Sequence, residues 1–440
     1  MAQRETRATR VGFILAAVGS AVGLGNIWRF PYMTAENGGA AFVVVYLLAA
    51  GLIGLPAMLA EFTIGRKAKK NVFDAFSSIG FPAWRIVGLL GLVTGFWILS
   101  YYSVVGGWVI QYLLGSFTGT YFGDPGTFFG DISTGPTTVA YHAVFMLITV
   151  GIVALGVKDG IEAATKAMVP SIVVILVGLA VWGVTLPGGA EGLAYFLSPD
   201  IDALLSNLDT IIPFAVGQAF FSLSLGMGVM ITYASYIGED DNLAVDAGSI
   251  VVLNTAIGVL AGLVVFPLLF AQNVDPGEAG AGAVFVSMAT AFGELPAGEL
   301  IGAVFFGVVL IAALSSAISL LEVVVSYTID NYDVSRVSVS VAVGAIIFLL
   351  GIPSALSLDT FGLYDEIANS LLLPTGVTLI VTFVGWVYGR DAVAELRQGT
   401  EGFGSFASTW LWHVRVVVLI AVVGTLVLSV SELLGISLFG

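Results

Sequence analysis

The chain has 440 residues, of which 58% are hydrophobic and only 10% are charged, and its formal net charge is −15. Soluble domains carry about 25% charged residues, so this composition excludes a soluble globular protein and indicates an all-α protein with many membrane-spanning helices. The absence of cysteine excludes disulfides and thiolate metal sites within the chain.

Apolar stretches long enough to cross a bilayer as helices recur along the whole sequence. We predict eleven of them, near residues 11–36, 40–64, 84–116, 137–156, 162–186, 207–236, 243–271, 297–329, 334–352, 364–388 and 409–431.

Two of these spans contain glycine-rich breaks. The first span includes the segment GSAVGLGN at residues 19–26, and the sixth includes FSLSLGMG at residues 221–228. A helix broken inside lipid leaves backbone groups unpaired, and each costs several kcal/mol unless a polar partner binds there. Two breaks, one near the start of each half, predict a transporter with a binding site at the membrane midplane.

The spans also predict an internal repeat. Residues 11–186 and 207–388 hold five spans each, and because five is odd, the second set enters the membrane from the opposite side. We therefore expect one transporter domain, 1–440, built from two inverted five-helix repeats. The helix near 409–431 lies outside the repeat, with a role in lipid packing or in contact between two copies.

The charges predict the orientation. If the N-terminus is cytoplasmic, all Lys and Arg residues except Arg29 lie in or beside inner loops, so we expect a multi-pass protein of the cell membrane. Acidic residues outnumber basic ones by 30 to 15, which favours a halophilic host over an ordinary acidic membrane protein. The expected partners are lipid and a small substrate, not nucleic acid, and the expected state is a monomer or weak dimer.

Three motifs together resemble the neurotransmitter:sodium symporters. GLGNIWRFP at 23–31, followed by ENGGAAF at 36–42, resembles their first helix. Residues 217–236 resemble their sixth helix, and LSSAISLLE at 314–322 resembles their eighth. The resemblance spans nearly the whole chain, and eleven spans resemble the short prokaryotic branch of the family.

The resemblance implies two sodium sites built from hard oxygen ligands. The first would use Ala21, Asn26, Ser222 and Asn254 with a carboxylate of the substrate, and the second would use Gly19, Val22, Ala312, Ser315 and Ser316. The alternative is that these polar residues only satisfy helix contacts in lipid.

Gly23 bears on the substrate, because relatives that carry monoamines have an aspartate at the matching position. A glycine there implies that the substrate supplies the carboxylate, so we expect an amino acid. The implied contacts are Ser20, Ala21, Leu24, Gly25, Ile98, Tyr102, Phe221, Ser222, Ser224, Met227, Ser316 and Leu320.

Met227 lies between two glycines, and this pattern resembles relatives that carry bulky hydrophobic and aromatic L-amino acids. Methionine is flexible and adapts to several shapes. We therefore predict sodium-coupled import of such amino acids by alternating access. Import of small amino acids or betaine-like osmolytes, or a sensor without transport, are the alternatives. No catalytic residues are expected, because the chain does not resemble an enzyme.

The resemblance also assigns gates. Arg29 and Asp365 would close the site from outside, and Arg4 and Asp330 would close it from inside, with Tyr236 near the inner pair. A segment from Gly160 to Pro170 resembles the family's unwinding fifth helix.

Two further acidic side chains are expected in the spans. Glu61 either holds the broken helices through backbone amides or is protonated and neutral, and the protonation state of Glu322 is open. Chloride-independent relatives carry an acid at the position of Asn254 or of Gly258, but both residues are neutral here. Our hypothesis is therefore that chloride supplies the negative charge and binds near Tyr46, Gln218 and Ser222.

Overall fold

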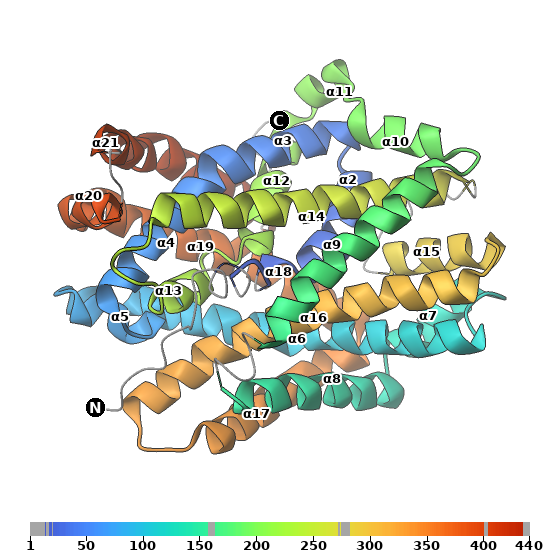
Figure 1. Ribbon diagram of the computed structural model, residues 1–440, viewed down its shortest axis with the longest axis horizontal. Coiled ribbons are helices and arrows are strands. Elements are labelled where there is room, and N and C mark those ends of the chain that lie inside the picture. Colours follow the sequence, from blue (N-terminus) through green and yellow to red (C-terminus); the bar gives the residue numbers. More distant parts are fainter. Residues whose placement is uncertain are drawn as a thin grey trace.

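The computed structural model describes residues 14, 17–19, 21–156, 163–271, 273, 282–399 and 404–433. Within these residues every regular element is a helix, and most of the helices run along one long axis (Figure 1). We name the two ends of this bundle by their helices. The α5 end carries α5 (Val72–Ser78) and α20 (Gly389–Arg397), and the α10 end carries α10 (Gly189–Leu197) and α15 (Ala283–Glu294).

Eight helices of the described chain are long and apolar enough to cross a membrane, and the pair Val169–Val184 and Gly189–Leu197, bent by 115°, makes a ninth if it is counted as one span. The two remaining ranges that the sequence predicts, 11–36 and 207–236, are the broken ones, so neither forms a single long helix. The prediction of an all-α protein with many membrane spans is therefore confirmed.

The elements follow in chain order. The first part of the chain contains η1 (Gly25–Arg29), α2 (Phe30–Glu36), α3 (Ala40–Ala49), η2 (Ala50–Gly54), α4 (Leu55–Ala68), α5, η3 (Pro82–Trp84), α6 (Arg85–Thr118), α7 (Pro125–Ser133), α8 (Pro136–Ala154) and α9 (Ala163–Val184). The second part contains α10, α11 (Ile201–Ser206), α12 (Leu208–Ser222), α13 (Val229–Ala234), α14 (Leu243–Ala271), α15, α16 (Gly298–Asn331), α17 (Arg336–Leu356), α18 (Leu358–Glu366), η5 (Ile367–Leu372), α19 (Leu373–Thr382), η6 (Phe383–Val387), α20, α21 (Gly404–His413), η7 (Val414–Val418) and α22 (Leu419–Leu433).

The first predicted break is present. Residues 17–19 and Ala21 are helical, the chain bends at Val22 and Gly23, and the π-helix η1 then leads into α2. The N–H of Asn26 donates to the carbonyl of Gly23 at 3.1 Å, so hydrogen bonding resumes directly after the bend. The carbonyls just before the bend are consequently available to other partners.

The second predicted break is also present, between α12 and α13. Ser224, Gly226 and Gly228 there have positive φ angles of 54°, 81° and 78°. Glycine adopts such angles without steric cost, which explains the two glycines. The buried Glu61 of α4 accepts a hydrogen bond from the N–H of Gly226 at 2.8 Å, so it contacts a backbone amide of the second break, as in one of the two alternatives that the sequence leaves open.

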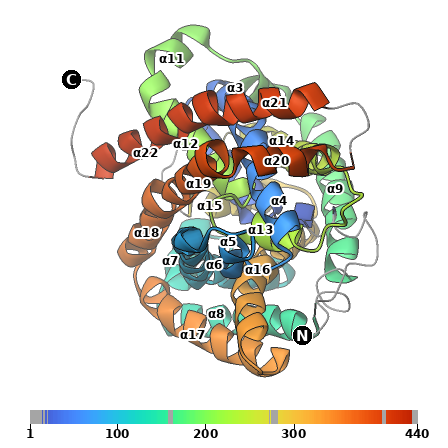
Figure 2. The same cartoon turned by 90° about the vertical axis from the view of Figure 1, so that its left-hand side faces the viewer.

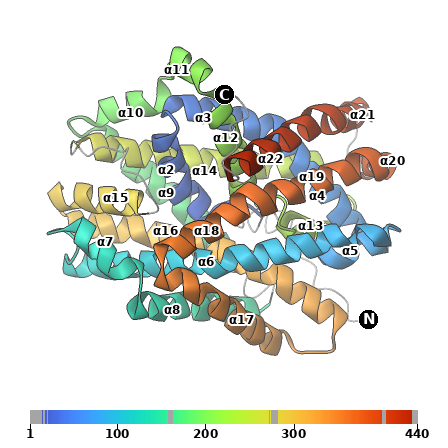
Figure 3. The same cartoon turned by 180° about the vertical axis from the view of Figure 1, so that it is seen from behind.

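Close packing surrounds the two breaks. Seen from the α5 end, α21 and α22 run along one side of the bundle and α8 and α17 along the opposite side (Figure 2). From behind, α18 and α19 lie beside α22 (Figure 3). Large apolar side chains such as Leu147, Val174 and Ile420 are about two-thirds exposed, as is expected of surfaces that face lipid.

Candidate functional site

A group of oxygen atoms gathers where the first break faces the second. The carboxamide oxygen of Asn254, on α14, lies 3.1 Å from the carbonyl oxygens of Ala21 and Ser222. Three acceptors cannot stabilise one another, so either the Asn254 amide is turned round to donate to both carbonyls or a cation lies among the oxygens. The structure thus brings together three of the four predicted ligands of the first site.

Asn26, the fourth predicted ligand, joins this group through its side chain. Its Nδ2 donates to the backbone and side-chain oxygens of Asn254, each at 3.0 Å, and its Oδ1 accepts from the N–H of Gly23 at 3.2 Å. Asn26 and Asn254 are both fully buried. Carbonyl and amide oxygens of this kind suit a hard cation.

A second group of oxygens lies on the other side of the first break. The hydroxyl of Ser315, on α16, donates to the carbonyls of Val22 and Ala312, each at 2.8 Å, and the Ser316 hydroxyl lies 3.4 Å from the carbonyl of Val22. Gly19, the fifth predicted ligand, is buried in the helical turn that precedes the bend. This donor set again consists of neutral hard oxygens.

The bend at Gly23 has no room for a side chain. A Cβ atom there would lie 2.1 Å from the Ser316 hydroxyl and 2.8 Å from the Tyr102 hydroxyl. The N–H of Leu24 donates to the Tyr102 hydroxyl at 3.1 Å. The two predicted contacts of a substrate carboxylate, Tyr102 and the Leu24 amide, therefore lie side by side.

Apolar and small polar side chains line the space next to this contact. These predicted residues are all buried: Ile98, Phe221, Ser224, Met227, Ser316 and Leu320. Met227 and Leu320 lie together over Gly95 of α6, where a Cβ atom would lie 3.6 Å from the Met227 carbonyl and 3.7 Å from Leu320 Cδ2. Phe221 also presses against Gly25, the remaining predicted contact of the first helix. Ser20 lies outside the described residues.

The residues of the chloride hypothesis are divided between two contacts. The hydroxyls of Tyr46 and Ser222 lie 3.1 Å apart. The amide of Gln218 instead donates to the carbonyl of Gly25 at 2.7 Å and accepts from Arg29 at 2.7 Å. Gln218 thus ties α12 to the first broken helix.

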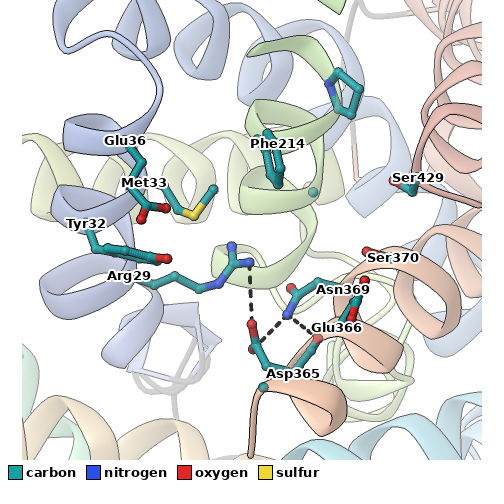
Figure 4. Close-up of a pocket in the computed structure, with 13 residues that line it drawn as sticks. Arg29, Tyr32, Met33, Glu36, Phe214, Asp365, Glu366, Asn369, Ser370 and Ser429 are labelled. Atoms are coloured by element: carbon teal, nitrogen blue, oxygen red, sulfur yellow. Dashed lines mark hydrogen bonds and ion pairs between the residues drawn. The ribbon is translucent and has the colours of Figure 1, made fainter. Parts of the chain in front are cut away.

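A cavity of about 330 Å³ lies beside Arg29, lined by residues of α2, α12, α18 and η5 (Figure 4). One guanidinium nitrogen of Arg29 lies 3.8 Å from the carboxylate of Asp365, which also accepts from Asn369 at 2.8 Å. The guanidinium lies over the Phe221 ring at 5.3 Å. The predicted pair of Arg29 and Asp365 therefore meets directly above Phe221.

At the α5 end, the hydroxyl of Tyr236 donates to Glu322 at 3.2 Å, and Arg336 donates to the same carboxylate at 2.6 Å. Asp330 accepts a hydrogen bond from Asn71 at 3.0 Å. Arg4 and Gly160 lie outside the described residues, and Pro170 is exposed on α9.

Two buried interactions at this end are absent from the sequence prediction. Arg66 donates to the side chain of Glu395 at 2.6 Å and to the carbonyl of Asp241 at 2.7 Å. In the sequence, Arg66 is distinguished only as one of a group of basic residues at 66–70. The exposed fraction of Arg66 in the structure is 1%. Through these hydrogen bonds it joins α4, α20 and the α13–α14 loop, which is a structural role.

The second is the network of Asp74 on α5. Partial burial opposes its ionisation, but hydrogen bonds from Asn71, Asn331 and Arg85 outweigh that effect and lower the pKa of Asp74 below its usual 3.8. The sequence feature that points to this network is Asn71, a helix-capping residue directly before a short amphipathic stretch.

Comparison with known proteins identifies the class. The profile of the sodium:neurotransmitter symporter family matches residues 4–122 and 132–437. The chain is 36% identical to the uncharacterised sodium-dependent transporter YhdH of Bacillus subtilis, over 94% of this chain and 95% of that protein. It is 28% identical to the bovine sodium- and chloride-dependent creatine transporter 1, over 88% of this chain and 71% of the relative.

Among solved structures, the chain is similar to MhsT in complex with L-phenylalanine. The TM-score is 0.89 and the sequence identity is 42%, with 97% of this chain and 100% of that chain covered. The likeness therefore extends over nearly the whole chain.

Proposed function

The chain belongs to the sodium:neurotransmitter symporter family, whose members are transporters rather than enzymes, and on that premise we propose that it imports hydrophobic and aromatic L-amino acids together with sodium. The similarity to MhsT, which was solved with L-phenylalanine, supports an amino acid as the substrate.

The observation that carries this proposal is the contact of Gly23 with Tyr102 and Ser316. No acidic side chain can enter here, because even a Cβ atom would lie 2.1 Å from the Ser316 hydroxyl. The oxygens around Asn254 are all neutral, so a cation among them needs a negative partner. The carboxylate of a bound amino acid supplies that charge and accepts hydrogen bonds from Tyr102 and the amides of Leu24 and Gly25.

We assign two sodium ions, one to the oxygens around Asn254 and one to those around Ser315. Each sodium ion that moves inward gains about 2.3 kcal/mol per 100 mV of membrane potential, in addition to its concentration ratio. Two ions per substrate therefore give a steep accumulation of the amino acid.

The mechanism is alternating access between inverted repeats 11–186 and 207–388. The α5 end faces the cytoplasm, because Arg66, Lys67, Lys69 and Lys70 cluster there. Arg29 and Asp365 close the site from the α10 end, with Phe221 beneath them. Asp330 belongs to the gate at the α5 end.

The substrate class is tested by competition against sodium-dependent uptake of labelled L-phenylalanine in proteoliposomes. Leucine and tryptophan should compete, whereas glycine and betaine should not. Met227→Phe should weaken competition by tryptophan more than competition by alanine, because a rigid ring replaces a flexible side chain in a buried pocket. Competition by glycine or betaine alone would overturn the assigned class, and sodium-dependent binding without uptake would indicate a sensor.

We further propose that chloride binds near Tyr46, Gln218 and Ser222. The supporting observations are the neutral Asn254 and Gly258 and the relative that is named as a sodium- and chloride-dependent transporter. A Cβ atom at Gly258 would have its nearest contact 3.6 Å away, at Asn26, which is an ordinary van der Waals distance. Replacing chloride by gluconate should slow wild-type uptake, and Gly258→Glu should remove that dependence. Unchanged wild-type uptake in gluconate would refute the proposal.

A further inference from the structure

Asn71 occupies the N-terminus of α5 and is fully buried. Its side-chain oxygen caps the helix by accepting from the N–H groups of Phe73 and Asp74, at 3.1 and 3.0 Å. This is the ordinary role of an asparagine at such a position. It accounts for the oxygen of the side chain but not for its nitrogen.

The side-chain nitrogen of Asn71 bridges two carboxylates. It donates to Asp74 at 2.9 Å and to Asp330, at the end of α16, at 3.0 Å. Asp74 is itself held in place by Asn331 and by Arg85, which donates to it at 3.0 Å. Asp74 therefore fixes the Asn71 amide, and the amide in turn fixes one oxygen of Asp330.

The residue next to Asn71 contacts the substrate-side break. A Cβ atom on Gly228 would lie 2.9 Å from the Val72 side chain, so Val72 packs directly against the segment that contains Met227. Val72 is 1% exposed. Its carbonyl in turn lies against Gly88 of α6, where a Cβ atom would be only 2.4 Å away. Two consecutive residues of one short segment thus touch the binding pocket and the carboxylate of Asp330.

The rest of α5 is anchored to neighbouring helices. Phe73 packs edge-on against Tyr327 of α16, with ring centroids 5.2 Å apart, and Arg85 lies over the Phe73 ring at 4.4 Å. Close packing of this kind moves as a unit rather than deforming gradually. A shift of the Gly226–Gly228 segment is therefore transmitted to Asn71.

We propose that Asn71 is a positioning residue that holds Asp330 in its closed-gate orientation and couples this gate to the Gly226–Gly228 segment of the binding pocket. The proposal rests on the proposed function, in which Asp330 belongs to the cytoplasmic gate. The chemistry requires a neutral amide, because only an amide both accepts from the helix N-terminus and donates to two carboxylates.

The test uses Asn71→Ser, which keeps a hydroxyl to cap α5 but is too short to donate to Asp330. The matched control is Asn242→Ser. Asn242 caps α14 in the same way, accepting from Ala244 and Val245, and within the described part of the chain its side chain bonds only to those amides. Asn71→Asp is the second variant, which keeps the cap but places a negative charge beside Asp74 and Asp330.

The readout is maleimide labelling of Ser235→Cys in the full-length protein, which has no native cysteine. Ser235 is 4% exposed next to Tyr236, so it reports opening of the α5 end. In sodium, Asn71→Ser should label faster than the parent by about tenfold to a hundredfold, the range expected for loss of a hydrogen bond to a charged group. Asn71→Asp should label faster still, and Asn242→Ser should stay within about twofold of the parent.

Equal labelling of Asn71→Ser and Asn242→Ser would overturn the proposal and leave Asn71 as a helix cap alone. No amino acid is added, so an error in the substrate class does not affect this result. The parent protein, which carries Ser235→Cys alone, should label more slowly in sodium than in potassium. If it does not, the proposed function is contradicted instead. Even with that result, the proposed role of Asn71 predicts that Asn71→Ser labels faster than the parent in potassium. Equal labelling rates of the two proteins in potassium would overturn the proposed coupling.

Discussion

Arg29 forms its shorter contact with Gln218 and not with Asp365: the guanidinium donates to the Gln218 oxygen at 2.7 Å, whereas the Asp365 carboxylate lies 3.8 Å away. Gln218 at the same time donates to the carbonyl of Gly25. One neutral side chain thus positions both the Arg29 guanidinium and the broken helix, and the contact of Arg29 with Asp365 is longer than a direct hydrogen bond.

This arrangement predicts a ranking of two substitutions. Gln218→Leu should weaken sodium-dependent binding of L-phenylalanine by about tenfold or more, because it removes a hydrogen bond to a buried charge. Asp365→Asn should weaken binding less, because its carboxylate is 28% exposed and makes no direct hydrogen bond to Arg29. Equilibrium binding to purified protein measures both effects, and the opposite ranking would contradict this account of the pair.

Gly23→Ala tests the tight contact at the first break. The added methyl group collides with the hydroxyls of Ser316 and Tyr102, so we expect L-phenylalanine binding to weaken by about tenfold to a hundredfold. Gly51→Ala is the matched control, because a Cβ atom there would meet no other atom within 4 Å. If both variants bind as tightly as the wild type, the bend at Gly23 does not form the site.

The buried pair of Arg66 and Glu395 predicts a stability effect. Glu395→Ala leaves the guanidinium buried with only backbone partners and should destabilise the protein by about 3–5 kcal/mol. The double variant Arg66→Met with Glu395→Leu should recover part of that loss, because no charge is then buried. Thermal unfolding in detergent measures both, and a double variant less stable than Glu395→Ala would argue against a desolvated ion pair.

Asp74 predicts a dependence of stability on pH, since it lies on α5, outside the membrane-spanning helices. Its pKa is lower in the folded protein than its usual 3.8, so ionisation of Asp74 stabilises the fold above that value. This contribution is lost as the pH falls through the lowered pKa. The difference in melting temperature between wild type and Asp74→Asn should therefore be constant above about pH 5 and shrink below about pH 3.8. A difference that grows on acidification would have the wrong sign.

The sequence predicts the two breaks because local composition determines them. Gly226 and Gly228 have the positive φ angles that glycine tolerates, and Gly23 lies where no side chain fits. The ligand residues of the proposed sodium sites were accessible only through the family motifs, since a lone Ser315 or Asn254 in a membrane helix is equally compatible with a structural role.

The interactions that the sequence does not reveal join residues far apart in the chain. Arg66 and Glu395 are separated by 329 positions, and Asn71 and Asp330 by 259. Arg66 belongs to a group of basic residues at 66–70, and its place in that group gives no sign of its structural role. The π-helical turn η7, with the sequence VRVVV, contains neither glycine nor proline, so no helix-breaking residue marks it in the sequence.

In the proposed mechanism, sodium drives accumulation of a hydrophobic amino acid through this protein. The most direct measurement is uptake of labelled L-phenylalanine into proteoliposomes with an inward sodium gradient, compared with the same vesicles after the gradient is dissipated. We expect a transient internal concentration of L-phenylalanine above the external one, and we expect it to disappear without the gradient. Equal uptake with and without the sodium gradient would contradict it.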